Sequence, residues 1–159
     1  YNGTHMKVHA MEELEPCVFC DIVAGKAPAS ITYEDDQVLA FLTIAPVASG
    51  HLMVMPKQHY ASVGELDEET GAYLFQVSMR MAAALRASGL RCEGVNWFLA
   101  DGEAAFQDVF HVHLHVFPRF KGDSFKVEAD WSAHPSREEL DAVAAKIRAA
   151  HDTLNPEGQ

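Results

Sequence analysis

The chain has 159 residues, of which 48% are apolar and 22% are charged, which suits one folded domain with a substantial core and argues against disorder. Twenty-three acidic and twelve basic residues give a formal net charge of −11, which argues against nucleic acid as a partner because duplex binding needs a basic surface. A small phosphate ligand is still compatible with this charge, since backbone N–H groups and protonated histidine can hold one phosphate.

The N-terminal segment, the apolar runs and the cysteine count indicate where in the cell we expect the protein. Residues 1–5 resemble an expression remnant ahead of Met6, so we expect one domain over residues 6–159. The segment after Met6 is charged and lacks the apolar stretch of a secretory signal, and no run of about 18 apolar residues offers a membrane span. Three cysteines without such a signal indicate a reducing compartment. We therefore expect a cytoplasmic protein with no membrane partner.

The first expected elements are a short helix and three strands. CVFCDIVAG (17–25) is typical of a short helix that ends at its glycine. ITYEDD (31–36) and QVLAFLTI (37–44) predict two strands joined by a tight turn at Asp35 and Asp36. GHLMVMP (50–56) is a further apolar run of strand type.

A long helix is expected next. Apolar residues recur at steps of three and four from Leu74 to Leu85, which is the helical period. Asp67 is a good N-cap, and Gly89 suits the C-terminal stop. The pattern predicts a helix over residues 68–88, roughly 30 Å long.

The remaining elements are two strands and a last helix. VNWFLAD (95–101) and FHVHLHVFPR (110–119) have strand character, and Ser136 opens a helix over about 136–154 with Glu139 at capping-box spacing. We expect this helix to bury an apolar stripe made of Leu140, Val143, Ala144, Ile147 and Leu154. Because the strands follow one another with few helices between them, an antiparallel α+β sheet is favoured over a doubly wound one.

Three histidines alternate with apolar residues in the last predicted strand. Residues two apart share one face of a strand, so His111, His113 and His115 are predicted to point one way and their neighbours into the core. The outer two start roughly 13 Å apart, whereas zinc needs each nitrogen at about 2.0–2.1 Å. One metal can bind two neighbours, but three would require strong twist. The spacing therefore favours different roles for the three histidines, one at a metal and the others facing a substrate, over chance surface histidines or an adventitious metal site.

Cys17 and Cys20 form a CxxC, which alone is compatible with a zinc half-site, a redox pair or two unoccupied thiols. A tetrahedral structural zinc site needs two more ligands, and His59 and one histidine of the row are the available donors. A redox pair is expected after a strand in a βαβ unit, which the pattern does not show. Zinc is therefore the favoured interpretation.

HVHLHV (111–116) matches the pattern His-φ-His-φ-His-φ-φ, with φ apolar, that names the histidine triad (HIT) family. The resemblance continues through CVFCDIVAG and the segments 31–59 and 100–119, and so covers about residues 17–120. The chain resembles zinc-bearing bacterial members of the Hint and Fhit type, which hydrolyse or transfer nucleoside monophosphates. This resemblance implies a HIT-like fold: a five-stranded antiparallel sheet, a long helix and a C-terminal helix, paired into a homodimer with a continuous ten-stranded sheet.

The resemblance also implies roles for single residues. His113 matches the nucleophile that attacks an α-phosphorus, and a backbone carbonyl holding its Nδ1–H would leave Nε2 free. His115 matches a phosphate hydrogen-bond donor, His51 a histidine supporting the triad, and Gln107 a glutamine near the phosphate. Backbone amides at Asp108 and Val109 are further candidates to neutralise phosphate charge. A structural zinc ion would be held by Cys17, Cys20, His59 and His111. The apolar wall around base and ribose would be Phe19, Ile22, Phe41, Ile44 and Met53, with Thr43 beside the ribose.

The implied substrates are dinucleoside polyphosphates, nucleoside phosphoramidates or adenylated amines, but four positions depart from the family pattern. Thr43 stands where Hint proteins carry an Asp that binds the ribose hydroxyls. Ala100 and Asp108 replace polar residues near the phosphate, and a carboxylate there is electrostatically awkward for an anion. Phe106 replaces a usual glycine and is expected to narrow the site. These departures motivate two rivals to an enzyme: a nucleotide-binding regulatory module with little turnover, and a zinc-stabilised dimeric scaffold without a ligand.

Overall fold

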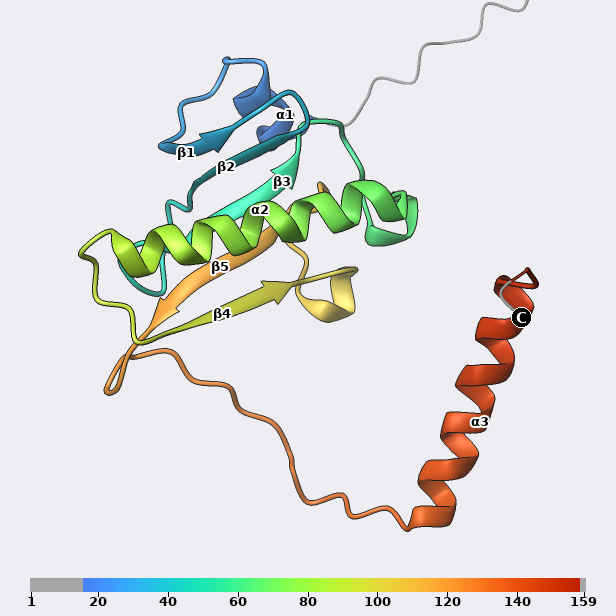
Figure 1. Cartoon of the computed structure of the whole chain (residues 1–159). Helices are drawn as coiled ribbons and strands as arrows, with labels where there is room; N and C mark the ends of the chain where they lie inside the picture. The colour runs from blue at the N-terminus through green and yellow to red at the C-terminus, as the bar shows by residue number, and fades with distance from the viewer. Residues whose placement is uncertain (1–15, 158–159) are drawn as a thin grey trace, which may run out of the picture. The chain divides into compact units, whose positions relative to one another are not determined.

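The structure is a computed structural model that describes residues 16–157. The interpretation of residues 1–5 as an expression remnant therefore lies outside the described residues. The chain divides into two compact units, the first ending at Phe125 and the second beginning at Lys126. The first unit holds all five strands and helices α1 and α2, and the second holds helix α3 (Figure 1).

Five strands form one antiparallel sheet in the order β1-β2-β3-β5-β4. Their bounds are β1 Ile31–Glu34, β2 Val38–Leu42, β3 Leu52–Pro56, β4 Gly94–Leu99 and β5 Leu114–Arg119. The Asp35 carboxylate makes the predicted turn between β1 and β2, because its Oδ1 accepts the N–H groups of Gln37 and Val38 at 2.8 and 2.7 Å. The predicted antiparallel α+β sheet is thus confirmed.

Helix α2 (Glu68–Ala87) packs on one face of the sheet. It begins as predicted, with the Asp67 carboxylate accepting the Thr70 N–H at 3.0 Å, and it is followed by Gly89 at φ +84°. Its buried stripe packs against alternate residues of β2, β3 and β5. The core on this face consists of Val38, Ala40, Leu52, Val54, Leu74, Val77, Met81, Ala82, Leu85, Val112 and Val116.

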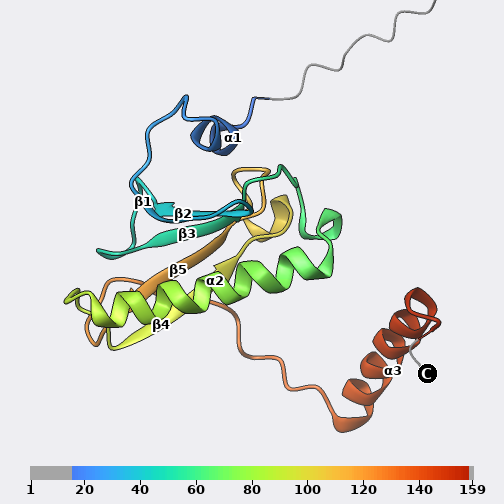
Figure 2. The ribbon, with the colours of Figure 1, turned by 45° about the horizontal axis from the view of Figure 1, so that its top comes forward.

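The opposite face of the sheet is covered by the short helix α1 (Val18–Val23), and Figure 2 shows α1 and α2 on opposite sides. Phe19 of α1 packs on the residues of β2 and β3 that alternate with the first core. This second cluster consists of Phe19, Leu39, Phe41, Met53 and Met55. Both faces of the central strands are therefore buried, which explains why β2 and β3 are continuous apolar runs in the sequence.

The predicted strand over residues 110–119 is wrong at its start, because β5 begins only at Leu114. Upstream, the Val112 N–H donates to the Tyr60 carbonyl at 2.8 Å instead of to a strand partner. Pro56 ends β3 without an N–H to donate, and its carbonyl accepts from the His111 ring instead of from a backbone N–H of the segment before β5. The predicted alternation still holds, since Val112 packs in the α2 core while the His113 ring packs on Phe19 of α1.

Helix α3 (Arg137–Leu154) begins with the predicted capping box. The Ser136 hydroxyl accepts the Glu139 N–H at 3.2 Å, and the Glu139 carboxylate accepts the Ser136 N–H at 2.7 Å. Its own unit does not bury the predicted apolar stripe, because that unit has no other described helix or strand for α3 to pack on, so the burial of the stripe stays a prediction. Among the described helices, none has the length and apolarity needed to span a membrane.

Candidate active site and metal-binding cluster

A largely apolar cavity of about 830 Å³ lies between α1, the central strands of the sheet and the segment that leads into β5. All but one of the residues predicted for substrate binding line it. They are Phe19, Ile22, Phe41, Thr43, Ile44, Met53, Asp108, Val109 and His115, and His113 lines it as well. The exception is Gln107. The lining residues come from six different segments of the chain between positions 18 and 115, and the fold brings them together around one cavity.

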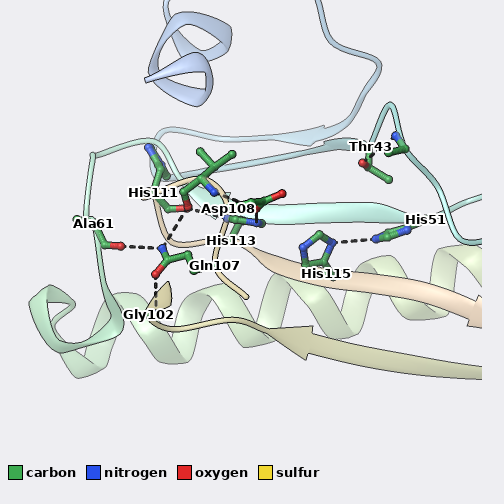
Figure 3. Close-up of polar contacts among 11 residues, drawn as sticks. Thr43, His51, Ala61, Gly102, Gln107, Asp108, His111, His113 and His115 are labelled. Atoms are coloured by element: carbon green, nitrogen blue, oxygen red, sulfur yellow. Dashed lines mark hydrogen bonds and ion pairs between the residues drawn. The ribbon is translucent and has the colours of Figure 1, made fainter. Parts of the chain in front are cut away.

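His113, the predicted nucleophile, is 4% exposed and presents one ring nitrogen to this cavity. Its Nδ1 lies 2.7 Å from the His111 carbonyl oxygen, which can only accept, so Nδ1 carries the proton and Nε2 is unprotonated in the neutral ring. The Phe19 ring packs edge-on against it with centroids 5.0 Å apart. Figure 3 shows Asp108 beside it, with Oδ1 3.8 Å from His113 Nε2.

His115 is oriented by a chain of hydrogen bonds that begins at the backbone. The Val47 N–H donates to His51 Nδ1 at 3.1 Å, so the neutral His51 ring carries its proton on Nε2. That nitrogen lies 2.8 Å from His115 Nδ1 and donates to it (Figure 3). The His115 proton is consequently on Nε2, where the ring reaches the cavity as a hydrogen-bond donor.

Burial keeps this pair uncharged. It lowers the pKa of His115 to about 4, with the nearby His113 and His51 rings lowering it further, and it also lowers the pKa of His51. Both rings are therefore neutral at pH 7. A neutral His115 donates one hydrogen bond with a fixed direction, which suits the recognition of one phosphate oxygen.

We predict that protonation of His115 couples to stability. Its folded pKa of about 4 lies below the unfolded value of about 6.5, so the unfolded chain binds more protons between these values. The contribution is complete above about pH 6.5 and is lost as the pH falls toward 4. Denaturant titrations across this range should show the free energy of unfolding falling less steeply in His115→Asn than in the parent chain. Equal slopes, or a His115 ring that titrates near 6.5 by NMR, would contradict the prediction.

Four further side chains form a separate cluster at the start of α1. The potential ligand atoms of Cys17, Cys20, His59 and His111 all lie within 4.8 Å of one another. The two histidine Nδ1 atoms are 3.2 Å apart, and the sulfur-to-Nδ1 distances are 3.4 to 3.6 Å. Tetrahedral zinc with ordinary bond lengths would hold such atoms about 3.3 and 3.6 Å apart. The cluster therefore fits the donor set and the geometry of a structural zinc site.

The cluster also has supporting contacts of the kind found around structural metals. His111 is fully buried, and its Nε2–H donates to the Pro56 carbonyl at 2.7 Å, which leaves Nδ1 for the cluster. Burial, with the neighbouring Cys17 thiol, raises the pKa of Cys20 to about 11. A cation is thus needed to hold this cysteine as a thiolate at neutral pH.

Gln107 does not line the cavity. Its side chain is buried and accepts the Gly102 N–H at 2.8 Å, while its amide nitrogen donates to Ala61 and Val109 at 2.8 and 3.1 Å (Figure 3). The bonds to Gly102 and Val109 lie within the loop before β5, and the bond to Ala61 joins this loop to the segment after β3. The structure therefore places Gln107 where it positions the loop, with its hydrogen-bonding groups already engaged.

The four departures from the family pattern have different places in the structure. Phe106 has φ +68° and is 84% exposed outside the cavity lining, so the expectation that it narrows the site is wrong. Its left-handed backbone explains why a glycine is usual there, since another residue costs about 1 kcal/mol. Ala100 is buried and also lies outside the lining. Thr43 lines the cavity, and its hydroxyl accepts the Ala45 N–H at 3.2 Å.

Several lining residues were not predicted from the sequence. They are Val18, Ala27, Pro28, Ala29, Ser30, Leu42 and Ala45. Most are small or lie in loops, and their only sequence signal is their position beside predicted residues. The segment after α1 reaches the cavity because the chain turns back at Gly25, where φ is +73°.

Comparisons with known proteins agree on one family. Residues 24–122 match the family described as HIT domain. An uncharacterized HIT-like protein of Mycobacterium tuberculosis is 40% identical over 86% of this chain and 96% of its own length. The crystal structure of a zinc-bound histidine triad family protein from Mycobacterium smegmatis has a TM-score of 0.67 and 43% identity, covering 84% of this chain and 96% of that one. Adenosine 5'-monophosphoramidase of Schizosaccharomyces pombe is 34% identical over 82% of this chain and 95% of its own length.

Proposed function

The chain belongs to the HIT family, and on that premise we propose that it is a nucleotidyl hydrolase or transferase that forms a covalent intermediate on His113. The observation that carries the proposal is the His113 ring, whose Nδ1–H is held by a carbonyl while Nε2 meets the cavity. An unprotonated imidazole nitrogen is a good nucleophile at neutral pH.

The cavity supports binding of a nucleoside 5'-phosphoryl group. Its apolar wall, with the Phe19 and Phe41 rings, suits a base, and Thr43 can donate its hydroxyl hydrogen to one ribose oxygen. The α-phosphate would then lie by His113 and His115. Val109 is less suited than expected to hold the phosphate, because its N–H already donates to the Asp108 carboxylate at 2.9 Å.

The proposed reaction has two displacements. The lone pair on His113 Nε2 forms a bond to the α-phosphorus. The bond from phosphorus to the leaving nitrogen or oxygen breaks with its electron pair, and a leaving amine takes up a proton from solvent. His115 Nε2–H donates to a phosphate oxygen and stabilises the charge that develops there. Water or another acceptor then attacks phosphorus and gives up a proton to solvent. The bond between phosphorus and Nε2 breaks, its electron pair returns to Nε2, and the nucleotide is released. Dividing the transfer in this way replaces one difficult step by two easier ones.

We propose that Cys17, Cys20, His59 and His111 hold one structural zinc ion. Zinc there would fix α1 to the segment before β5, and it would take His111 out of the chemistry. The His111 carbonyl would still hold the His113 proton. His111 would thus bind the metal and His113 would act on the substrate, which are the different roles that the spacing of the histidines favours.

Phosphoramidates and dinucleoside polyphosphates are the proposed substrates, and the name of the Schizosaccharomyces pombe relative supports the former. The direct test is incubation of the protein with adenosine 5'-phosphoramidate and measurement of released AMP. Multiple turnovers support the enzyme. Nucleotide that raises the unfolding temperature without turnover would favour the regulatory binding module instead. No turnover and no thermal shift would favour the scaffold.

We also propose a homodimer in which β4 pairs with β4 of a second copy. In the described sheet β4 is an edge strand that pairs only with β5. Trp97 and Leu99 on this strand are exposed beside Phe75 and Met79 of α2, and the Phe75 and Trp97 rings lie 6.1 Å apart. An exposed edge with an apolar flank usually needs a partner. Pairing of two copies would join their sheets and cover this patch.

Substitution of this patch should shift the protein to monomer. We predict that Met79→Glu raises the dimer dissociation constant at least about 10-fold, because it places a charge in an apolar contact. Ala84→Glu, exposed on α2 outside the patch, is the matched control and should leave the association unchanged. Sedimentation at several concentrations measures both. A parent protein that is monomeric throughout the range would refute the dimer.

A further inference from the structure

The cavity has an unusual charge for a site that receives phosphate. Among the described residues that line it, none is lysine or arginine, and Asp108 is the one with a carboxylate. That side chain is 83% exposed, and its Oδ1 lies 3.8 Å from His113 Nε2. The carboxylate is thus next to the atom that would attack phosphorus, as Figure 3 shows.

The short distance between Asp108 Oδ1 and His113 Nε2 limits how far the carboxylate can be from the atom that leaves phosphorus. A reacting phosphorus lies about 3–3.5 Å from its nucleophile, so the first leaving atom is within roughly 5 Å of Nε2. Whatever its direction, that atom is then less than about 9 Å from Asp108 Oδ1, which is shorter than the screening length of about 10 Å in 0.1 M salt. A charge on that atom, or on a group close to it in the leaving group, therefore interacts with the carboxylate.

The Asp108 carboxylate also accepts a hydrogen bond from the Val109 N–H, a backbone group that a bound phosphate would otherwise use. The Val109 N–H donates to Asp108 Oδ1 at 2.9 Å, so a phosphate oxygen approaching this amide would have to displace an internal anion. A polyphosphate leaving group would add several negative charges close by. With no lysine or arginine in the described lining, that charge would have no cationic partner there.

We propose that Asp108 determines leaving-group specificity, favouring phosphoramidates whose leaving amine carries a positive charge and disfavouring polyphosphates. The inference rests on the proposed function and narrows its substrate class. An ammonium group on the amine would face an exposed carboxylate and be attracted to it, whereas a phosphate or carboxylate would be repelled. For unit charges at these separations the effect on kcat/KM is about threefold to thirtyfold in each direction.

The test uses three adenosine phosphoramidates with the same P–N bond and alkyl chain, ending in trimethylammonium, hydroxyl or carboxylate. We expect the parent protein to prefer the cationic over the anionic compound at least about 10-fold in kcat/KM. Asp108→Asn, which keeps an oxygen acceptor for the Val109 N–H, should bring this ratio near one. Raising the salt concentration should shrink the ratio in the parent protein alone.

Asp36→Asn is the matched control, because it removes one exposed carboxylate from a residue outside the cavity lining. It should keep the parental ratio. An unchanged ratio in Asp108→Asn, or no charge preference in the parent protein, overturns the inference.

If none of the three compounds is hydrolysed, the proposed catalytic function fails, and the charge preference is read from their dissociation constants by calorimetry instead. Weaker discrimination in Asp108→Asn than in the parent chain would then still support the inference. Equal binding of all three by both proteins would overturn it.

Discussion

Replacing His113 with alanine should reduce the hydrolysis of adenosine 5'-phosphoramidate by about 10⁴-fold or more. The substitution removes Nε2, which is the atom proposed to form the bond to phosphorus, and no other described ring presents an unprotonated nitrogen to the cavity in the same way. His115 cannot replace it, because its cavity-facing nitrogen carries the proton. Initial rates of AMP release measure the loss.

The covalent intermediate gives this prediction a second readout. Rapid quenching in alkaline denaturant, which preserves a bond between phosphorus and imidazole nitrogen, should show a parent chain whose mass has increased by one adenylyl group. The variant should show no such increase. His134→Ala is the matched control, since it removes an exposed imidazole from the second unit. Equal rates in the parent chain and His113→Ala would exclude the mechanism. A fast enzyme that forms an adduct on another residue would exclude it as well.

Binding of nucleotide should survive this substitution. The apolar wall of the cavity contributes most of its lining and is untouched by the change at position 113. A nucleotide should therefore still raise the unfolding temperature of His113→Ala. This separates loss of chemistry from loss of the fold.

Removal of the proposed zinc ion should lower the unfolding temperature by about 10 °C or more. The cluster joins Cys17 and Cys20 at the start of α1 to His59 and His111, so its ligands come from three separate parts of the chain. Without a cation, α1 would be held mainly by the packing of Phe19 and its neighbours on the sheet. Elemental analysis should find about one zinc per chain as purified, and scanning calorimetry with and without a chelator measures the shift.

Two cysteine variants separate the metal from the helix cap. The Cys17 sulfur also accepts the Cys20 N–H at 3.4 Å at the start of α1. Cys17→Ser keeps a capping oxygen but is a poor zinc ligand, so it should lose both zinc and stability. Cys92→Ala should keep the zinc, because Cys92 lies outside the cluster and contacts the Gly94 carbonyl. Fully folded protein that is free of metal when purified would refute the site.

Loss of zinc should affect catalysis only through structure. His111 supplies its carbonyl to His113, and the same residue supplies its ring to the cluster. Release of the ring would loosen the carbonyl that keeps the His113 proton on Nδ1. We therefore propose that zinc in the cluster supports the active site by holding the His111 carbonyl in place beside His113.

Local patterns were sufficient for most of the fold. Periodicity and capping residues predicted α2 and the start of α3, because Asp67 and Ser136 act on N–H groups only three residues away. The alternation through residues 111–116 predicted which side chains share a face, since this depends only on neighbouring peptide units. The predicted strand nevertheless began too early, because the His111 ring and the Val112 N–H bond to the carbonyls of Pro56 and Tyr60, which lie far away in the sequence.

The contents of the site were predicted less evenly. The CxxC and the spacing of the histidine row predicted a metal site and different roles for the three histidines. The nucleophilic role of His113 and the choice of His111 as the metal donor came from family resemblance, and the fold brings His111 to the cluster. No sequence pattern shows that the Gln107 side-chain amide is hydrogen-bonded to backbone groups. None shows that the Val109 N–H donates to the Asp108 carboxylate.

Proton positions and burial depended most on the folded chain. The proton on His115 follows from Val47 and His51, which lie more than sixty residues away in the sequence and act only through contact. The apolar stripe of α3 was visible as a period, but its burial needs a surface to pack on, which its own unit does not contain. Residue types and short spacings decide which chemistry is available, because these are local properties. Long-range packing decides which ring nitrogen lies at the cavity, which lies in the cysteine and histidine cluster and which carries the proton.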